Sequence, residues 1–70
     1  MDLATKLRII RALRDTTQQE LSDKTGIPNR DISKYECNRS RPTEDQEAAL
    51  RQALEWPSQA EPAFDLLDQP

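Results

Sequence analysis

The sequence contains no histidine and only one cysteine, Cys37, among its 70 residues. A zinc cluster or an internal disulfide needs more than one such ligand, so neither can form within this chain. With one cysteine, one tyrosine and no histidine, most acid–base and nucleophilic catalytic arrangements are also out of reach. We therefore expect a protein that is not an enzyme and that holds no metal or other cofactor.

Glycine, aromatic residues and long apolar runs are equally scarce. There is one Gly and one each of Phe, Trp and Tyr, and no run alternates in the way that indicates strands. Apolar positions are mostly Leu, Ile and Ala, which favours an all-α fold. No stretch has the apolar length of a membrane span, and the first residues lack the apolar segment of a signal peptide. We expect a cytoplasmic protein of one small domain, near the lower size limit for unaided folding.

The net charge of −3 hides a strong asymmetry along the chain. Residues 1–43 carry nine Lys and Arg against six Asp and Glu, a net charge of +3. Residues 44–70 carry Arg51 alone against seven acidic residues, a net charge of −6. Because salt screens exposed charges beyond roughly 8 Å, the local balance decides which partner a surface attracts. Residues 1–43 can therefore bind a polyanion although the whole chain has a net negative charge.

Residues 17–36, T-Q-Q-E-L-S-D-K-T-G-I-P-N-R-D-I-S-K-Y-E, predict two short helices joined by a tight turn. Thr17 and Glu20 have the spacing of a capping box, which would begin a helix over 18–25. Gly26 can adopt the left-handed conformation that ends it. Pro28 suits the first turn of a second helix over 28–37. One side of that helix is polar and the other packs, which is the geometry of a helix-turn-helix that reads the DNA major groove.

The flanking segments predict three further helices. A first helix over 2–14 would be capped by Asp2 and would bury an apolar stripe made of Leu3, Leu7, Ile10 and Leu13. Thr43 and Gln46 form a second capping box, which opens a helix through about residue 55. Ser58 and Glu61 have the same spacing and predict a short fifth helix, with Ala60, Ala63, Phe64 and Leu67 on one face. The alternative is a C-terminal tail that is frayed or becomes ordered only on a partner.

Residues 5–56 resemble the Cro/C1-type (XRE-family) helix-turn-helix regulators. The segments that carry the resemblance are L-R-I-I-R, T-Q-Q-E-L-S, the turn G-I, the pattern I-S-x-Y-E, and R-P-T ahead of A-A-L-R-Q-A-L. Their combined spacing is specific, whereas each segment alone would be weak. The chain departs from the family pattern at Asp15 and Asn38, where the family often has Gly. The resemblance implies a compact lambda-repressor-like DNA-binding domain of four or five helices, over residues 1–57.

The resemblance also implies roles for single residues. The positions that match base contacts of the family are Asn29, Arg30, Ser33 and Lys34, and a phosphate contact is the alternative for Lys34. The positions that match contacts to DNA phosphates are Gln18, Arg39 and Arg41. Thr17 precedes Gln18 at the start of the helix, where free backbone amides can also bind a phosphate. Arg11 matches an arginine that pairs with the glutamate at the end of the recognition helix, here Glu36. The alternative to DNA contact is that Asn29 and Arg30 are simply solvent-exposed residues at a helix start. For Arg39 and Arg41 it is an ordinary solvent-exposed loop. On position we favour DNA contact for both sets.

The resulting functional prediction is a sequence-specific transcriptional regulator, a repressor or autoregulator that binds a palindromic operator in double-stranded DNA as a homodimer. A stand-alone domain of this size fits the autoregulators of phages and other mobile elements. Four apolar residues in or just before the segment 58–70 either complete the monomer core or form a dimerisation surface: Trp56, Phe64, Leu66 and Leu67. The alternative function is a protein-interaction module, in which the acidic segment docks a basic partner such as a toxin or an RNA polymerase surface.

Overall fold

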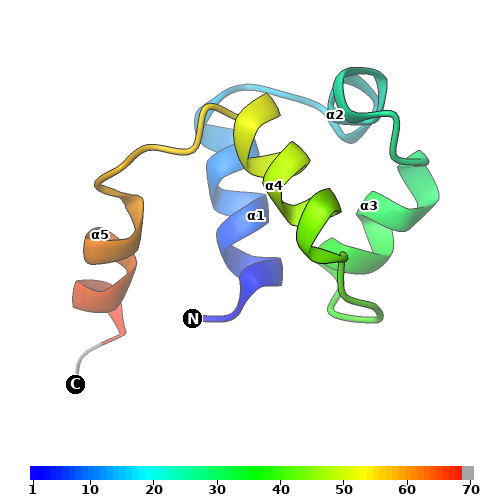
Figure 1. The fold of residues 1–70 in the computed structure, drawn as a ribbon. Coiled ribbons are helices and arrows are strands. Elements are labelled where there is room, and N and C mark those ends of the chain that lie inside the picture. The colour runs from blue at the N-terminus through cyan, green and yellow to red at the C-terminus, as the bar shows by residue number, and fades with distance from the viewer. Residues whose placement is uncertain (69–70) are drawn as a thin grey trace.

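The computed structural model describes residues 1–68, which form five helices and no strand. They are α1 (Leu3–Leu13), α2 (Gln18–Thr25), α3 (Asn29–Glu36), α4 (Glu44–Ala53) and α5 (Ala60–Leu67). Helices α1 and α4 lie in the middle, α2 and α3 on one side of them, and α5 on the other (Figure 1). The all-α prediction is confirmed. The last two residues of the predicted C-terminal segment, 69–70, lie outside the described residues.

Side-chain caps fix where three of the helices begin. The Asp2 carboxylate accepts from the Thr5 amide at 2.9 Å and starts α1. Both expected capping boxes are present, Thr17 with Glu20 at α2 and Thr43 with Gln46 at α4. Each box satisfies amides that the first turn leaves without a helical acceptor. The helix starts therefore follow from residues only three positions apart.

A small apolar core holds the helices together. Its fully buried side chains are Leu7, Ile10, Leu21, Ile32, Leu50 and Leu54. Each such side chain contributes roughly 1.5–3 kcal/mol relative to an exposed one. The expected stripe of the first helix was wrong at one end, because Leu13 is 66% exposed while Ala4 is buried. Leu13 lies in the last turn of α1, where it lines an open apolar groove with Ile9 and Ala63.

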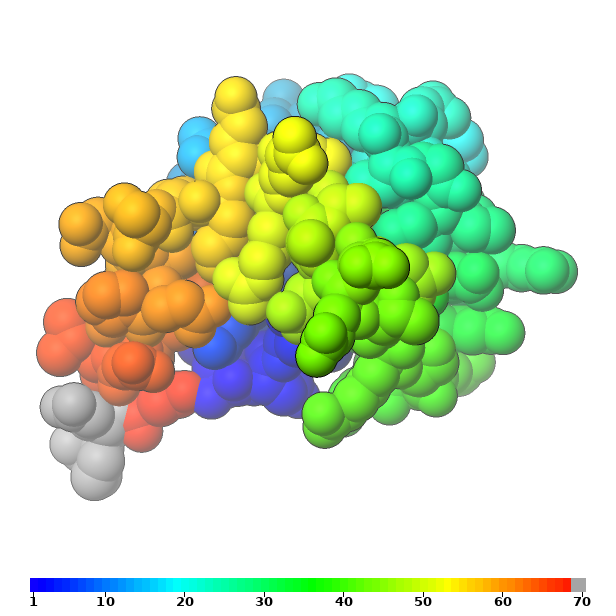
Figure 2. Space-filling view, viewed as in Figure 1, coloured from blue at the N-terminus to red at the C-terminus, as the bar shows by residue number. Residues whose placement is uncertain are grey.

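Helix α5 is attached to the rest of the domain by apolar and ionic contacts. Ala60 and Phe64 belong to the core cluster. The Glu61 carboxylate accepts from Lys6 Nζ at 2.6 Å and from Arg51 Nη1 at 3.4 Å. The amino group of Met1 also pairs with the carboxylate of Asp68, so both ends of the described chain meet. In Figure 2 the α5 segment lies on the side of the molecule opposite α3.

Two expectations for the C-terminal segment were wrong. The Ser58–Glu61 capping box does not form, since α5 begins after Gln59 without a side-chain cap. The Glu61 carboxylate turns instead to Lys6 and Arg51, whose positive charges are stronger partners than a backbone amide. The expected face of α5 is also split, because Ala63 and Leu67 are exposed while Ala60 and Phe64 are buried.

Within residues 1–68, no helix has the length and apolar character needed to cross a bilayer. No group of three or more potential metal-ligating side chains comes together in the same range.

Candidate DNA-binding interface

A tight turn sets α3 against α2. Gly26 has a φ of +76°, and its amide donates to the Ser22 carbonyl at 2.8 Å. The Ser22 hydroxyl donates to the Ile27 carbonyl at 2.6 Å, which ties the chain after the turn back to α2. Ile27 is buried in the core cluster. These contacts leave little freedom between the two helices, so α3 is presented in one orientation.

Helix α3 has two distinct faces. Ile32, Tyr35 and Glu36 are buried against the rest of the domain. The predicted base-contacting residues occupy the outer side, where Arg30 and Lys34 are exposed and Asn29 and Ser33 are partly exposed. Because they lie at spacings of three and four, their side chains form one continuous surface. Among the described residues, neither Arg30 nor Lys34 has an acidic partner in a salt bridge.

The end of α3 is held by a buried carboxylate. Glu36 is only 3% exposed and accepts from Arg11 Nε at 2.7 Å and from Arg11 Nη2 at 3.0 Å. Its Oε1 also accepts from the Gln18 amide nitrogen at 3.0 Å. The hydrogen bond to Glu36 raises the pKa of Arg11, so the guanidinium stays charged. The structure thus brings together three predicted residues and connects α1, the start of α2 and the end of α3.

The N-terminus of α2 lies beside this network. Thr17 is exposed, and its hydroxyl accepts from the Glu20 amide at 3.0 Å. The amides of Gln18 and Gln19 belong to the first turn and have no helical acceptor. Such amides, together with the positive end of the helix dipole, favour an anion. Thr17 and Gln18 therefore stand where a phosphate could be bound.

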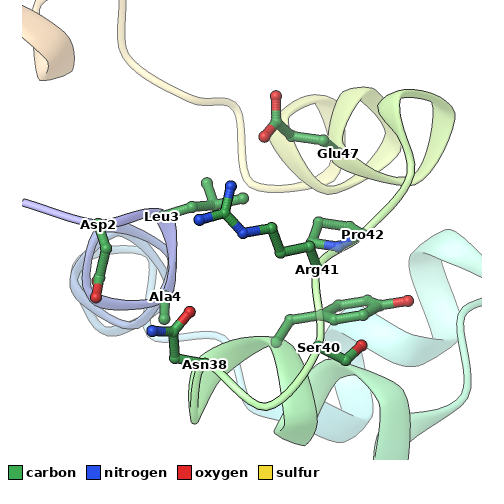
Figure 3. A pocket seen from close by; sticks show the side chains of 9 residues that line it. Asp2, Leu3, Ala4, Asn38, Ser40, Arg41, Pro42 and Glu47 are labelled. Atoms are coloured by element: carbon green, nitrogen blue, oxygen red, sulfur yellow. The ribbon is translucent and has the colours of Figure 1, made fainter.

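The loop between α3 and α4 carries the two remaining predicted residues, Arg39 and Arg41, both exposed. Arg41 extends from the loop across a cavity of about 360 Å³ toward Leu3 of α1 (Figure 3). Asp2 and Glu47 line the same cavity. The structure thus places Arg41 beside the start of α1.

Backbone conformation explains two departures from the family pattern. Asp15 has a φ of +50° and Asn38 a φ of +60°, both in the left-handed region. Asp and Asn are the residues other than Gly that visit this region most readily. They can therefore make the turns that Gly makes in the family. Glu55 also has a positive φ, of +48°, and α4 ends just before it.

Sequence reasoning missed the contacts of two polar residues, Arg14 and Gln19. Arg14 donates from Nε to the Leu54 carbonyl at 3.1 Å and from Nη2 to the Glu55 carbonyl at 2.7 Å, which satisfies the end of α4. Gln19 accepts from the Asn29 amide nitrogen at 3.0 Å. The contact of Gln19 could not be read from spacing, because the two residues lie on different helices and ten positions apart.

A family model described as helix-turn-helix matches residues 7–55, which covers α2, the turn and α3. The chain belongs to the Cro/C1-type helix-turn-helix family. This helix-turn-helix protein is therefore a DNA-binding domain, of a family whose members are typically not enzymes. No curated protein matches the chain, and no solved structure does.

The predicted dimerisation residues of this helix-turn-helix protein divide into two pairs. Phe64 is buried and Trp56 is partly buried against the core, with Arg51 Cζ 4.5 Å from the centre of its ring. Leu66 and Leu67 are 69% and 70% exposed. The first pair therefore completes the monomer, and only the second pair is available to another molecule.

Proposed function

We propose that this protein is a sequence-specific transcriptional regulator that inserts α3 into the DNA major groove and represses the genes next to its operator. The observation that supports it is the outer surface of α3, where Asn29, Arg30, Ser33 and Lys34 project away from the core. Arg can bond O6 and N7 of guanine bidentately, and Asn can bond N6 and N7 of adenine. Arg30 and Asn29 are assigned these roles. Ser33 and Lys34 contact base edges further along the groove.

Contacts to the DNA backbone position α3. The free amides at the start of α2, with Thr17 and Gln18, bind one phosphate, and Arg39 and Arg41 bind others. Arg41 reaches the backbone after its exposed side chain changes rotamer from the one it adopts across the cavity. Contacts of this kind carry no sequence information but set register and give affinity a strong salt dependence.

The regulator acts as a symmetric dimer on a palindromic operator, with the two copies of α3 about 34 Å apart. Support for self-association comes from apolar surface between α1 and α5. Ile9, Leu13, Ala63 and Phe64 line a groove of about 230 Å³, and Leu66 and Leu67 are exposed on α5. Leu67 follows Ala63 by four residues, so it continues the groove side of that helix. A second copy would cover this surface.

The protein-interaction alternative has weaker support. It requires the acidic segment after residue 43 to present free carboxylates to a basic partner. Glu47 and Glu61 already pair with Arg51, Glu61 also pairs with Lys6, and Asp68 pairs with the amino group of Met1. The remaining acids are spread over two helices and the link between them. We therefore favour the regulator.

Gel-shift titration tests the proposal, with a duplex enriched from a random library by the purified protein. Affinity should fall steeply and linearly on a log–log plot as salt rises. Arg30→Ala should lose about 1–3 kcal/mol of discrimination at one base pair per half-site and leave the other positions unchanged. Lys24→Ala, an exposed lysine at the other end of α2, is the control and should keep the sequence preference.

Two outcomes would contradict the assignment. An equal loss of Arg30→Ala binding on every sequence would make Arg30 a phosphate contact. Enrichment of no sequence at all by the unaltered protein would refute sequence-specific regulation.

A further inference from the structure

A chain of hydrogen bonds connects α2 to the first residue of α3. The amide nitrogen of Gln19 donates to Asp23 Oδ1 at 3.0 Å, and the two residues are four positions apart on α2. The amide oxygen of Gln19 accepts from the Asn29 amide nitrogen at 3.0 Å. Through Gln19, Asn29 is therefore connected by two successive hydrogen bonds to the carboxylate of Asp23, across the turn of the helix-turn-helix.

The chemistry of the three groups gives this chain a direction. An ionised carboxylate can only accept hydrogen bonds, so Asp23 must face the amide nitrogen of Gln19. The amide oxygen of Gln19 then faces Asn29, so Asn29 must donate a hydrogen bond from its amide nitrogen. Rotation of Asn29 by half a turn about its last torsion would put two oxygens in contact. Asp23 therefore disfavours one of the two amide orientations that Asn29 could adopt.

Orientation matters because an asparagine amide presents a donor at one end and an acceptor at the other. Adenine is matched when the oxygen accepts from N6 and the nitrogen donates to N7. After its bond to Gln19, the Asn29 nitrogen keeps one N–H, and its oxygen remains free. A freely rotating amide could instead donate to guanine or accept from cytosine.

We propose that Gln19 and Asp23 are positioning residues that hold the Asn29 amide in the orientation required to select adenine. The inference rests on the proposed function, because it assumes that Asn29 contacts a base. Neither Gln19 nor Asp23 needs to touch the DNA. The effect strengthens in the complex, where exclusion of water lowers the local dielectric constant.

The double replacement Gln19→Glu with Asp23→Asn offers a sharp test, since it reverses the first bond and keeps the second. The amide nitrogen introduced at position 23 donates to the carboxylate introduced at position 19, which still accepts from Asn29. Net charge and side-chain sizes stay almost the same. Asp23→Asn alone removes the fixed acceptor, so Gln19 and Asn29 can both rotate. Asp65→Asn removes one negative charge from exposed α5 and is the control.

The experiment selects DNA from a random duplex library with the full-length chain and with each variant, and compares base preference position by position. Asp23→Asn should lower the preference for adenine at one position per half-site by about fivefold, toward the lower end of what one bidentate contact contributes. The double variant should restore it. The melting temperature, the salt slope and preference at other positions should not change, since a merely structural role would move those instead.

Other outcomes separate the two levels of the inference. Specific binding with the same adenine preference in Asp23→Asn would overturn the positioning role and leave the proposed function intact. A uniform loss over all positions, or failure of the double variant to recover, would also overturn it. If the unaltered chain enriches no sequence, the proposed function itself fails and the positioning role fails with it.

Discussion

Removal of the Arg11 side chain should destabilise the domain severely. Arg11→Met keeps most of the aliphatic volume but leaves the Glu36 carboxylate, 3% exposed, with Gln18 as its remaining side-chain partner. Breaking a buried ion pair in this way costs about 3–5 kcal/mol. We expect about 3 kcal/mol, because the Arg11 side chain is itself 23% exposed and water can reach the vacated space.

The assay for this prediction is thermal unfolding followed by circular dichroism. A domain of this size loses about 4–8 °C per kcal/mol, so 3 kcal/mol corresponds to a melting temperature about 12–24 °C lower. That loss is a large part of the roughly 4–10 kcal/mol expected for the whole chain. Arg8→Met, an exposed arginine on the same helix, is the control and should stay within about 0.5 kcal/mol of the unaltered protein.

A second variant identifies the cause of the loss. Arg11→Met combined with Glu36→Leu removes both charges, and replacement of a buried pair by apolar side chains is often neutral. The double variant should therefore recover most of the stability lost by the single one. An Arg11→Met loss below about 1 kcal/mol would show that water replaces the arginine, in line with an exposed pair. A double variant as unstable as the single one would show that packing, not an unpaired charge, is responsible.

Three more perturbations test other parts of the fold. The hydrogen bond from Lys6, together with the positive charges of Lys6 and Arg51, lowers the pKa of Glu61 from its ordinary 4.5. The ionised carboxylate therefore stabilises the fold above that pH, and this contribution is lost as pH falls through the folded pKa. Glu61→Gln should therefore flatten the fall in melting temperature between about pH 5 and pH 3, and an unchanged slope would refute this. Gly26→Ala should cost about 1–2 kcal/mol in thermal unfolding through its positive φ alone, because an added Cβ meets no atom within 4 Å. Ile32→Ala should cost about 2–5 kcal/mol in urea unfolding, and a smaller loss would mean that the core closes over the cavity.

Residues 17–36 show how much could be predicted from the sequence. The capping box at Thr17, the left-handed Gly26 and the two faces of α3 are all found where the sequence indicated. The placement of Arg11 against Glu36 was expected only from the family resemblance, and the structure contains that contact. The DNA contacts and the dimer remain proposals.

The sequence by itself determined the starts of α1, α2 and α4, the turn and the polar face of α3, because each depends on residues within about four positions. Only the tertiary structure decided which ends of the amphipathic stripes are covered, as the exposed Leu13 and Leu67 show. The tertiary structure also decided which hydrogen-bond partners the polar side chains take. Glu61 could have capped its own helix but pairs with Lys6, 55 positions earlier, and Asn29 meets Gln19 across a turn. Long-range contacts of this kind compete with local ones, and their outcome depends on how the helices pack.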